Sequence, residues 1–223
     1  MSEPNDASTI AERGDQPDPD LRRTPQLGRP MEPTLLDAVR TTLSTSGEAV
    51  RRAAERVRDR GDSLPELPLT ATDEAGRRIT YRPYEDGDVE PLVRMYDDFD
   101  PADRAQGTPP LGEQRVRSWL DEVLDGVHAV AVHDERVVGH VMLVPDGTGR
   151  HELAIFVHQS HQGAGIGTTL LRAGLGHARD AGIGYVWLSV GASERRLQKW
   201  YSRTGGFSTV NPMGMAHRMS RRL

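Results

Sequence analysis

The feature that most constrains this chain is a glycine-rich stretch, QSHQGAGIGTTLL, at residues 159–171. Three glycines alternate along it, Gly163, Gly165 and Gly167, and the apolar periodicity that follows predicts a helix over residues 166–181. The first amides of a helix lack intrahelical acceptors, and the helix dipole makes that end partly positive. A backbone without side chains lets a phosphate approach those amides closely. The stretch therefore predicts an anion site built from main-chain NH groups.

Three phosphate-binding patterns compete for this stretch. A dinucleotide-binding pattern, Gly-x-Gly-x-x-Gly, fails because its third glycine falls on Thr168 when it starts at Gly163. A P-loop fails because it needs Gly-Lys-Ser/Thr, and the only lysine is Lys199. The third pattern is Gln162-x-x-Gly165-x-Gly167, preceded by the strand-like run ELAIFV. A purely structural helix cap stays open as an interpretation, although three alternating glycines exceed what a cap needs.

Hydrophobic periodicity from residue 77 onward predicts a regular series of elements. Residues 77–84 alternate as a strand, and residues 88–99, with Asp88 as N-cap, and 113–124 have helical spacing. Residues 126–159 contain three strand-like runs separated by turns, which predict an antiparallel meander. After the glycines come a helix, a buried strand at 183–190, a helix at 193–204, and one or two strands at 205–223. This order predicts an α+β (mixed α/β) domain with a partly parallel sheet.

The amino-terminal third differs in composition from this domain. Residues 1–33 are rich in proline and charge and poor in large hydrophobic residues, which predicts a disordered tail. Residues 34–60 repeat apolar residues at helical intervals and predict an extra amphipathic helix. Residues 61–76 combine prolines with small polar residues and predict a linker, so the folded domain is expected at 77–223.

Composition excludes several classes of function. The chain has no cysteine, so disulfides, thiolate metal sites and a cysteine nucleophile are excluded. A net charge of −5 argues against nucleic acid as a partner, because phosphate binding needs a clustered basic face. No apolar run approaches the about 18 residues of a membrane span, and no signal peptide begins the chain, so we expect a cytoplasmic protein that does not bind membranes.

The Gln162-x-x-Gly165-x-Gly167 motif occurs with a strand before it, and with a later helix that contains Tyr201 and is followed by a Gly-Phe pair. In these features residues 79–222 resemble the GCN5-related N-acetyltransferase (GNAT) superfamily. The resemblance implies an acyl-CoA N-acyltransferase fold, a mixed, mostly antiparallel sheet flanked by helices and splayed between its fourth and fifth strands. It implies acetyl-CoA as cosubstrate, with the pantetheine arm paired to the backbone of Ile155, Phe156 and Val157. The pyrophosphate would be held by the backbone of Gln162, Gly163, Ala164, Gly165, Ile166, Gly167 and Thr168.

Amine acetylation needs a route for the amine proton, because an alkyl amine with a pKa near 10.4 is almost fully protonated at neutral pH. Glu152 is the predicted base, since it is the ionisable residue in the apolar run ELAIFV and shares a strand face with Ala154 and Phe156. The structural alternatives for Glu152 are a carboxylate paired with an arginine, or simply a residue at the start of a strand. Further candidates for the base are three aspartates between the first two helices, Asp98, Asp100 and Asp103.

The resemblance places Tyr201 where a hydroxyl protonates or orients the CoA sulfur; its structural alternative is a core aromatic beside Trp200. Two departures affect this position: Glu194 stands where the family commonly has Asn, and Tyr201 and Phe207 are one residue further apart than usual. Histidines near the motif, among them His158 and His161, lack metal-ligand spacing, so no metal is expected. His158 and His161 could instead contact substrate or a CoA phosphate, or lie in a solvated loop.

These observations predict an N-acetyltransferase that moves an acetyl group from acetyl-CoA directly to a primary amine, without an acyl-enzyme. One alternative is a non-catalytic acyl-CoA-binding module that regulates a partner through the amino-terminal helix. Another is a protein lysine or amino-terminal acetyltransferase, whose basic peptide would be attracted by the acidic residues at 97–103. The sequence leaves open the acceptor, a homodimer, the role of residues 34–60, and whether Glu152 acts directly or through water.

Overall fold

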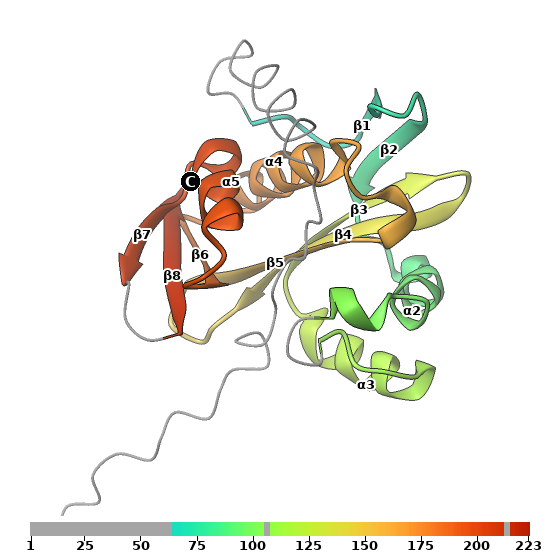
Figure 1. Cartoon of the computed structure of the whole chain (residues 1–223), viewed down its shortest axis with the longest axis horizontal. Helices are drawn as coiled ribbons and strands as arrows, with labels where there is room; N and C mark the ends of the chain where they lie inside the picture. The colour runs from blue at the N-terminus through green and yellow to red at the C-terminus, as the bar shows by residue number, and fades with distance from the viewer. Residues whose placement is uncertain (1–63, 105–107, 212–214) are drawn as a thin grey trace, which may run out of the picture. The chain divides into compact units, whose positions relative to one another are not determined.

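The computed structural model describes residues 64–104, 108–211 and 215–223 (Figure 1). The predicted tail at 1–33 and the predicted amphipathic helix at 34–60 lie outside the described residues. Eight strands form one sheet in the order β1-β2-β3-β4-β5-β6-β8-β7. The strands are β1 (Leu69–Thr72), β2 (Arg78–Pro83), β3 (Val127–His133), β4 (Arg136–Pro145), β5 (His151–Val157), β6 (Tyr185–Gly191), β7 (Ser208–Asn211) and β8 (Ala216–Arg222).

Four α-helices accompany the sheet within the described residues. They are α2 (Val89–Asp97), α3 (Glu113–Val123), α4 (Ile166–Asp180) and α5 (Arg195–Gly205), with short 3-10 turns η2 (Asp86–Asp88), η3 (Pro101–Asp103) and η4 (Gln159–His161). All neighbouring strands pair antiparallel except β5 and β6, which are parallel. The predicted mixed, mostly antiparallel α+β fold is therefore confirmed, together with the order of its elements after residue 77.

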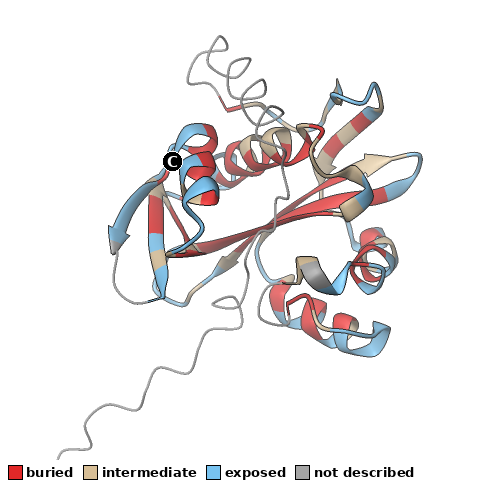
Figure 2. Ribbon diagram, in the orientation of Figure 1, coloured by how far each residue is buried: buried red, intermediate tan, exposed pale blue. Residues whose placement is uncertain are grey.

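The helices cover the two faces of the sheet separately (Figure 2). Helices α4 and α5 pack on one face, where Leu170, Leu171 and Ile155 belong to one buried cluster. Helices α2 and α3 pack on the other face, where Tyr96, Trp119 and Phe156 belong to a second cluster. Because both faces are covered, the central strands are apolar along almost their whole length; β4 is buried from Val137 to Leu143. Within the described ranges, no helix is both long and apolar enough to cross a bilayer.

The predicted linker at 61–76 is wrong in part, because residues 69–72 form strand β1. This short edge strand pairs antiparallel with β2, Leu69 opposite Tyr81 and Thr72 opposite Arg78. Leu69 and Ala71 are partly buried and pack against the core cluster, while Thr70 and Thr72 are exposed. Four residues beside prolines are too few to show a strand period in the sequence, so the pattern was hidden.

Asp88 precedes α2 as predicted, but its carboxylate makes no capping hydrogen bond. Arg82 on β2 instead donates two hydrogen bonds of 2.6 Å to its two oxygens, and the Glu85 amide donates a third of 2.9 Å. Burial alone would raise the pKa of Asp88, but these hydrogen bonds outweigh it and lower the pKa. The residue therefore joins β2 to α2 as a nearly buried ion pair.

Candidate active site

The glycine loop, defined as residues 162–168, connects η4 to helix α4. Gly163 and Gly165 both have positive φ, +76° and +86°, and Gly165 is the left-handed N-cap of the helix. The side chains of Ala164 and Ile166 alternate with them and are buried, with 7% and 1% exposure. A Cβ added to Gly163 would meet nothing within 4 Å. Two apolar anchors thus hold the loop at the amino end of α4, where Gly163 and Gly165 are partly exposed and Gly163 has open space beside it.

Three parts of the fold fasten this loop. The Glu74 amide, in the turn between β1 and β2, donates to the Ala164 carbonyl at 3.0 Å. Trp200 on α5 donates from Nε1 to Thr168 Oγ1 at 3.3 Å. The Gln162 side chain donates to the Val157 carbonyl at 3.0 Å and to an Asp103 carboxylate oxygen at 3.1 Å. The loop is therefore positioned before any ligand arrives.

Strands β5 and β6 part soon after they begin. Their register contains only two pairs, His151 with Val186 and Glu152 with Trp187. The other edge of β5 pairs with β4 from His151 to Val157. Ile155, Phe156 and Val157 therefore lie, within the described chain, on an edge that has no registered partner in β6. Leaving β1 aside, β5 and β6 are the fourth and fifth strands, where the resemblance implied the splay.

Glu152 is the last paired residue before this fork. Its side chain is 4% exposed. It shares a strand face with Ala154 and Phe156, which belong to the cluster beneath α2 and α3. A buried carboxylate thus lies at the base of the fork, on the face opposite α4 and α5.

Tyr201 lies on the other face. It is 3% exposed and belongs to the cluster beneath α4 and α5, with its ring centroid 4.8 Å from that of Trp200 and 5.9 Å from that of Phe207. The additional residue noted in the sequence is accommodated at the end of α5, where Gly206 adopts φ +66° and the Phe207 amide bonds the Tyr201 carbonyl at 3.3 Å. Phe207 consequently still returns to pack on Tyr201.

The three aspartates proposed as further base candidates lie near the glycine loop and not near Glu152. Gln159 donates to the Asp98 carbonyl at 2.6 Å and accepts from the Asp100 amide at 3.2 Å, and Gln162 reaches Asp103. These contacts are at the carboxyl end of β5, whereas Glu152 is near its amino end, about 17 Å from Val157 along the strand. The sequence did not predict this connection between residues 98–103 and the segment from Gln159 to Gln162, because it depends on tertiary contacts.

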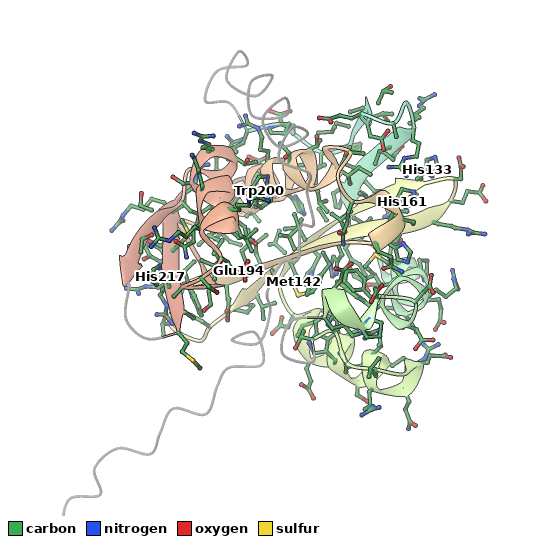
Figure 3. All side chains as sticks on the ribbon, viewed as in Figure 1. His133, Met142, His161, Glu194, Trp200 and His217 are labelled. Carbon is green, nitrogen blue, oxygen red and sulfur yellow. The ribbon has the colours of Figure 1, made fainter. Side chains whose placement is uncertain are left out.

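Histidines around η4 form a polar chain on the surface. His158 contacts Asp98 through Nε2 at 3.2 Å and Ser160 Oγ through Nδ1 at 2.7 Å. Ser160 Oγ lies 2.8 Å from His161 Nδ1, and His161 Nε2 lies 3.3 Å from His133 Nδ1. Figure 3 shows His133 and His161 side by side. Burial, then Arg77 and the neighbouring imidazoles, lowers the pKa of His161 to about 4. Across the part of the chain that the structure describes, no three potential ligands converge as a metal site.

A second polar chain, buried and not anticipated, crosses the cluster beneath α2. The Tyr96 hydroxyl lies 2.7 Å from His140 Nδ1, and His140 Nε2 lies 3.1 Å from His128 Nδ1. His128 Nε2 is buried without a hydrogen-bond partner among the described residues. Burial, followed by His177, lowers the pKa of His128 to about 4, and burial, followed by His128, lowers that of His140. Two histidines on the same face of otherwise apolar strands were the available sequence signal.

These imidazoles should make the fold acid-sensitive. In the unfolded chain His128 is protonated below about pH 6.5, the ordinary pKa of histidine. In the folded chain it is protonated only below about pH 4. The unfolded state therefore binds more protons between these pH values, and the free energy of unfolding falls as pH drops through this window. We expect the free energy of unfolding to fall by on the order of 2 kcal/mol between pH 7 and pH 4.5 from this residue. Urea titrations at both pH values measure it. His128→Gln should reduce the difference, whereas the half-exposed His217→Gln should leave it; equal pH dependence in all three proteins would contradict the assignment.

Comparison with known proteins agrees with this geometry. The model of the acetyltransferase (GNAT) family matches residues 92–207. An uncharacterized N-acetyltransferase of Mycobacterium tuberculosis is 34% identical over 110 residues, covering 44% of this chain and 70% of the relative. A mycothiol acetyltransferase of Catenulispora acidiphila is 28% identical over 173 residues, covering 70% of this chain and 53% of the relative.

The fold also matches a solved structure. The GNAT domain of S. lividans PAT superposes with a TM-score of 0.57 at 21% identity, covering 70% of this chain and 97% of that domain. This likeness concerns the fold, while the family match covers half of the sequence, including β5, the glycine loop and α5. The chain therefore belongs to the acetyltransferase (GNAT) family and is an acyltransferase.

Proposed function

We propose that this enzyme transfers an acetyl group from acetyl-CoA directly to a primary amine. The observation that carries the proposal is the combination of the partly exposed glycine loop with the adjoining β5 edge. The loop offers amides at a helix N-terminus to a diphosphate. The edge offers main-chain groups of Ile155, Phe156 and Val157 to an extended arm, as an added strand would use them. A ligand with a diphosphate joined to an amide-bearing chain fits both features.

In this proposal the diphosphate is held by the backbone of the glycine loop. Gly163 leaves room beside the loop, and the buried side chains of Ala164 and Ile166 keep the loop in place. The Gln162 side chain already bonds the Val157 carbonyl, so it orients the end of the β5 edge. The arm then runs along β5 toward the fork, which brings the thioester near Glu152.

The chemistry needs a proton acceptor first. An amine with a pKa near 10.4 is disfavoured by roughly 4 kcal/mol as a nucleophile at neutral pH. Glu152 takes the amine proton, directly or through water, and the nitrogen attacks the thioester carbonyl. The new C–N bond forms, the nitrogen gives up a second proton to solvent, the C–S bond breaks, and the sulfur leaves as a thiolate. The Tyr201 hydroxyl protonates or orients that sulfur from the opposite face of the sheet.

A transfer assay with the full chain tests the proposal. Acetyl-CoA is incubated with a panel of small amines and of peptides with free amino termini or lysines, and both released CoA and the mass shift of the acceptor are measured. The panel should include the unacetylated amine of mycothiol, because one relative carries that thiol in its name. We expect acceptor-dependent CoA release with a gain of one acetyl group. Acetyl-CoA binding without transfer to any acceptor would favour the non-catalytic module.

A further inference from the structure

A second cavity lies away from the glycine loop. It has a volume of about 700 Å³ and lies among α4, α5, β6, β7 and β8. We call it the arginine pocket, because four arginines line it: Arg172 from α4, Arg203 from α5, and Arg221 and Arg222 from β8. Its size falls within the about 300–1,000 Å³ that is typical of small-molecule sites.

The arginine pocket and the glycine loop occupy opposite ends of the sheet. The glycine loop follows the carboxyl end of β5, whereas the pocket includes Tyr185, the first residue of β6. Since β5 and β6 are parallel, their equivalent ends point the same way. Figure 1 shows the same separation, with α5, β7 and β8 on one side and the connection from β5 to α4 on the other. A ligand on the glycine loop would therefore not fill the arginine pocket.

The composition of the lining is strongly biased. The chain contains 33 acidic and 28 basic residues, yet the described residues that line the pocket include four arginines and no aspartate or glutamate. Hydroxyl donors accompany the guanidinium groups, among them Ser202 and Ser220. A guanidinium with neighbouring hydroxyls is the donor set that recognises phosphate oxygens.

Nearby contacts reinforce the positive character. Arg221 Nη1 donates to the Gly205 carbonyl at 2.6 Å, so a cation occupies the partly negative end of α5 that would otherwise repel an anion. Arg150 lies over the Tyr185 ring, with its guanidinium carbon 4.8 Å from the ring centroid, and adds another positive charge beside the pocket. Arg203 and Arg222 are exposed and reach the pocket from α5 and β8.

We infer that the arginine pocket binds a small phosphate-bearing anion, separate from the cosubstrate. Arginines from three elements, α4, α5 and β8, contribute to the lining of the cavity, so one ligand with two or more charged oxygens can contact more than one of them. The site joins α5, which carries Tyr201, to the carboxyl end of the domain. Binding there would bridge these elements.

Calorimetry with the full-length protein tests the inference, with inorganic phosphate, pyrophosphate and citrate as probes at one fixed ionic strength. Because pyrophosphate could also bind the glycine loop, the titrations are done in the Gly165→Asp background as well. We expect pyrophosphate to bind in both proteins, more tightly than phosphate or citrate. Tighter binding of citrate would overturn the phosphate assignment, and no binding of any probe in the Gly165→Asp background would overturn the site.

A pair of double variants identifies the location. Arg203→Gln with Arg222→Gln removes two exposed pocket arginines and should weaken pyrophosphate binding about tenfold or more, since each lost guanidinium removes charge-assisted hydrogen bonds. Arg195→Gln with Arg196→Gln removes the same charge at the exposed start of α5, outside the pocket. It should leave the affinity unchanged. Circular dichroism checks that both variants are folded, and equal losses in the two would show general surface charge instead of a site.

Discussion

Gly165→Asp is expected to weaken acetyl-CoA binding by at least about 100-fold. The substitution combines three unfavourable effects at this one residue: backbone strain, loss of access to the amides, and repulsion between carboxylates. The residue has φ +86°, a conformation that a side chain disfavours. The new carboxylate would lie at the amino end of α4, where the proposed diphosphate needs the amides. Glu74 Oε1 already lies 3.6 Å from the position of an added Cβ, so the substitution would place two carboxylates together. Calorimetric titration with acetyl-CoA measures the loss.

Gly182→Asp is the matched control for this experiment. Gly182 follows α4, has φ +83°, and has nothing within 4 Å of an added Cβ. It therefore introduces the same carboxylate with similar backbone strain at the other end of the same helix. We expect it to retain wild-type affinity for acetyl-CoA. If folded Gly165→Asp binds as tightly as Gly182→Asp, the glycine loop does not hold the diphosphate.

Glu152→Gln is expected to lower kcat/KM at neutral pH by about 10²–10⁴-fold, the usual contribution of a general base. The amide keeps the size and burial of the side chain but cannot accept the amine proton. The rate of the variant should rise with pH toward that of the wild type, because the amine loses its own proton as pH approaches 10.4. Initial rates of CoA release from pH 6 to pH 10 test this, once an acceptor is known.

Two comparisons separate a base from a structural carboxylate. Acetyl-CoA affinity should not change in Glu152→Gln, because Glu152 lies away from the glycine loop. Tyr201→Phe should lower the rate less, because a thiol with a pKa near 8.5 leaves tolerably without a proton donor. A Glu152→Gln enzyme that is fully active at every pH would show that another group takes the proton, and Asp98→Asn, Asp100→Asn and Asp103→Asn are then the next variants to assay.

The sequence predicted those parts of the fold that have long and regular apolar patterns. The meander from β3 to β5, the helix α4 and the buried strand β6 each span at least seven residues, enough for their periods to be seen. Strand β1 was not predicted, because its four residues, which lie between prolines and a turn, are too few to show an alternating apolar pattern. Asp88 was expected to cap α2, but Arg82 binds its carboxylate across the turn, a contact that sequence neighbours cannot indicate.

The same distinction applies to the candidate site. The glycine loop could be predicted because its function depends on consecutive backbone groups, which are local in sequence. Its attachments could not be predicted, since Glu74, Asp103 and Trp200 are distant in sequence. The buried chain of Tyr96, His140 and His128 was missed for the same reason, because each histidine alone looks like an ordinary strand residue. The roles of Glu152 and Tyr201 stay predictions until the variants are measured.

Strands β5 and β6 separate after two residue pairs, which leaves a gap in the hydrogen bonding inside the sheet. We call this gap the seam. Strand edges invite pairing with other chains, and proteins commonly protect them with an inward-pointing charge. Glu152, the last residue of β5 that is registered with β6, is a buried ionisable side chain at the point where the two strands separate. A reactant that docked along β5 would close the seam and add its binding energy to the stability of the folded chain.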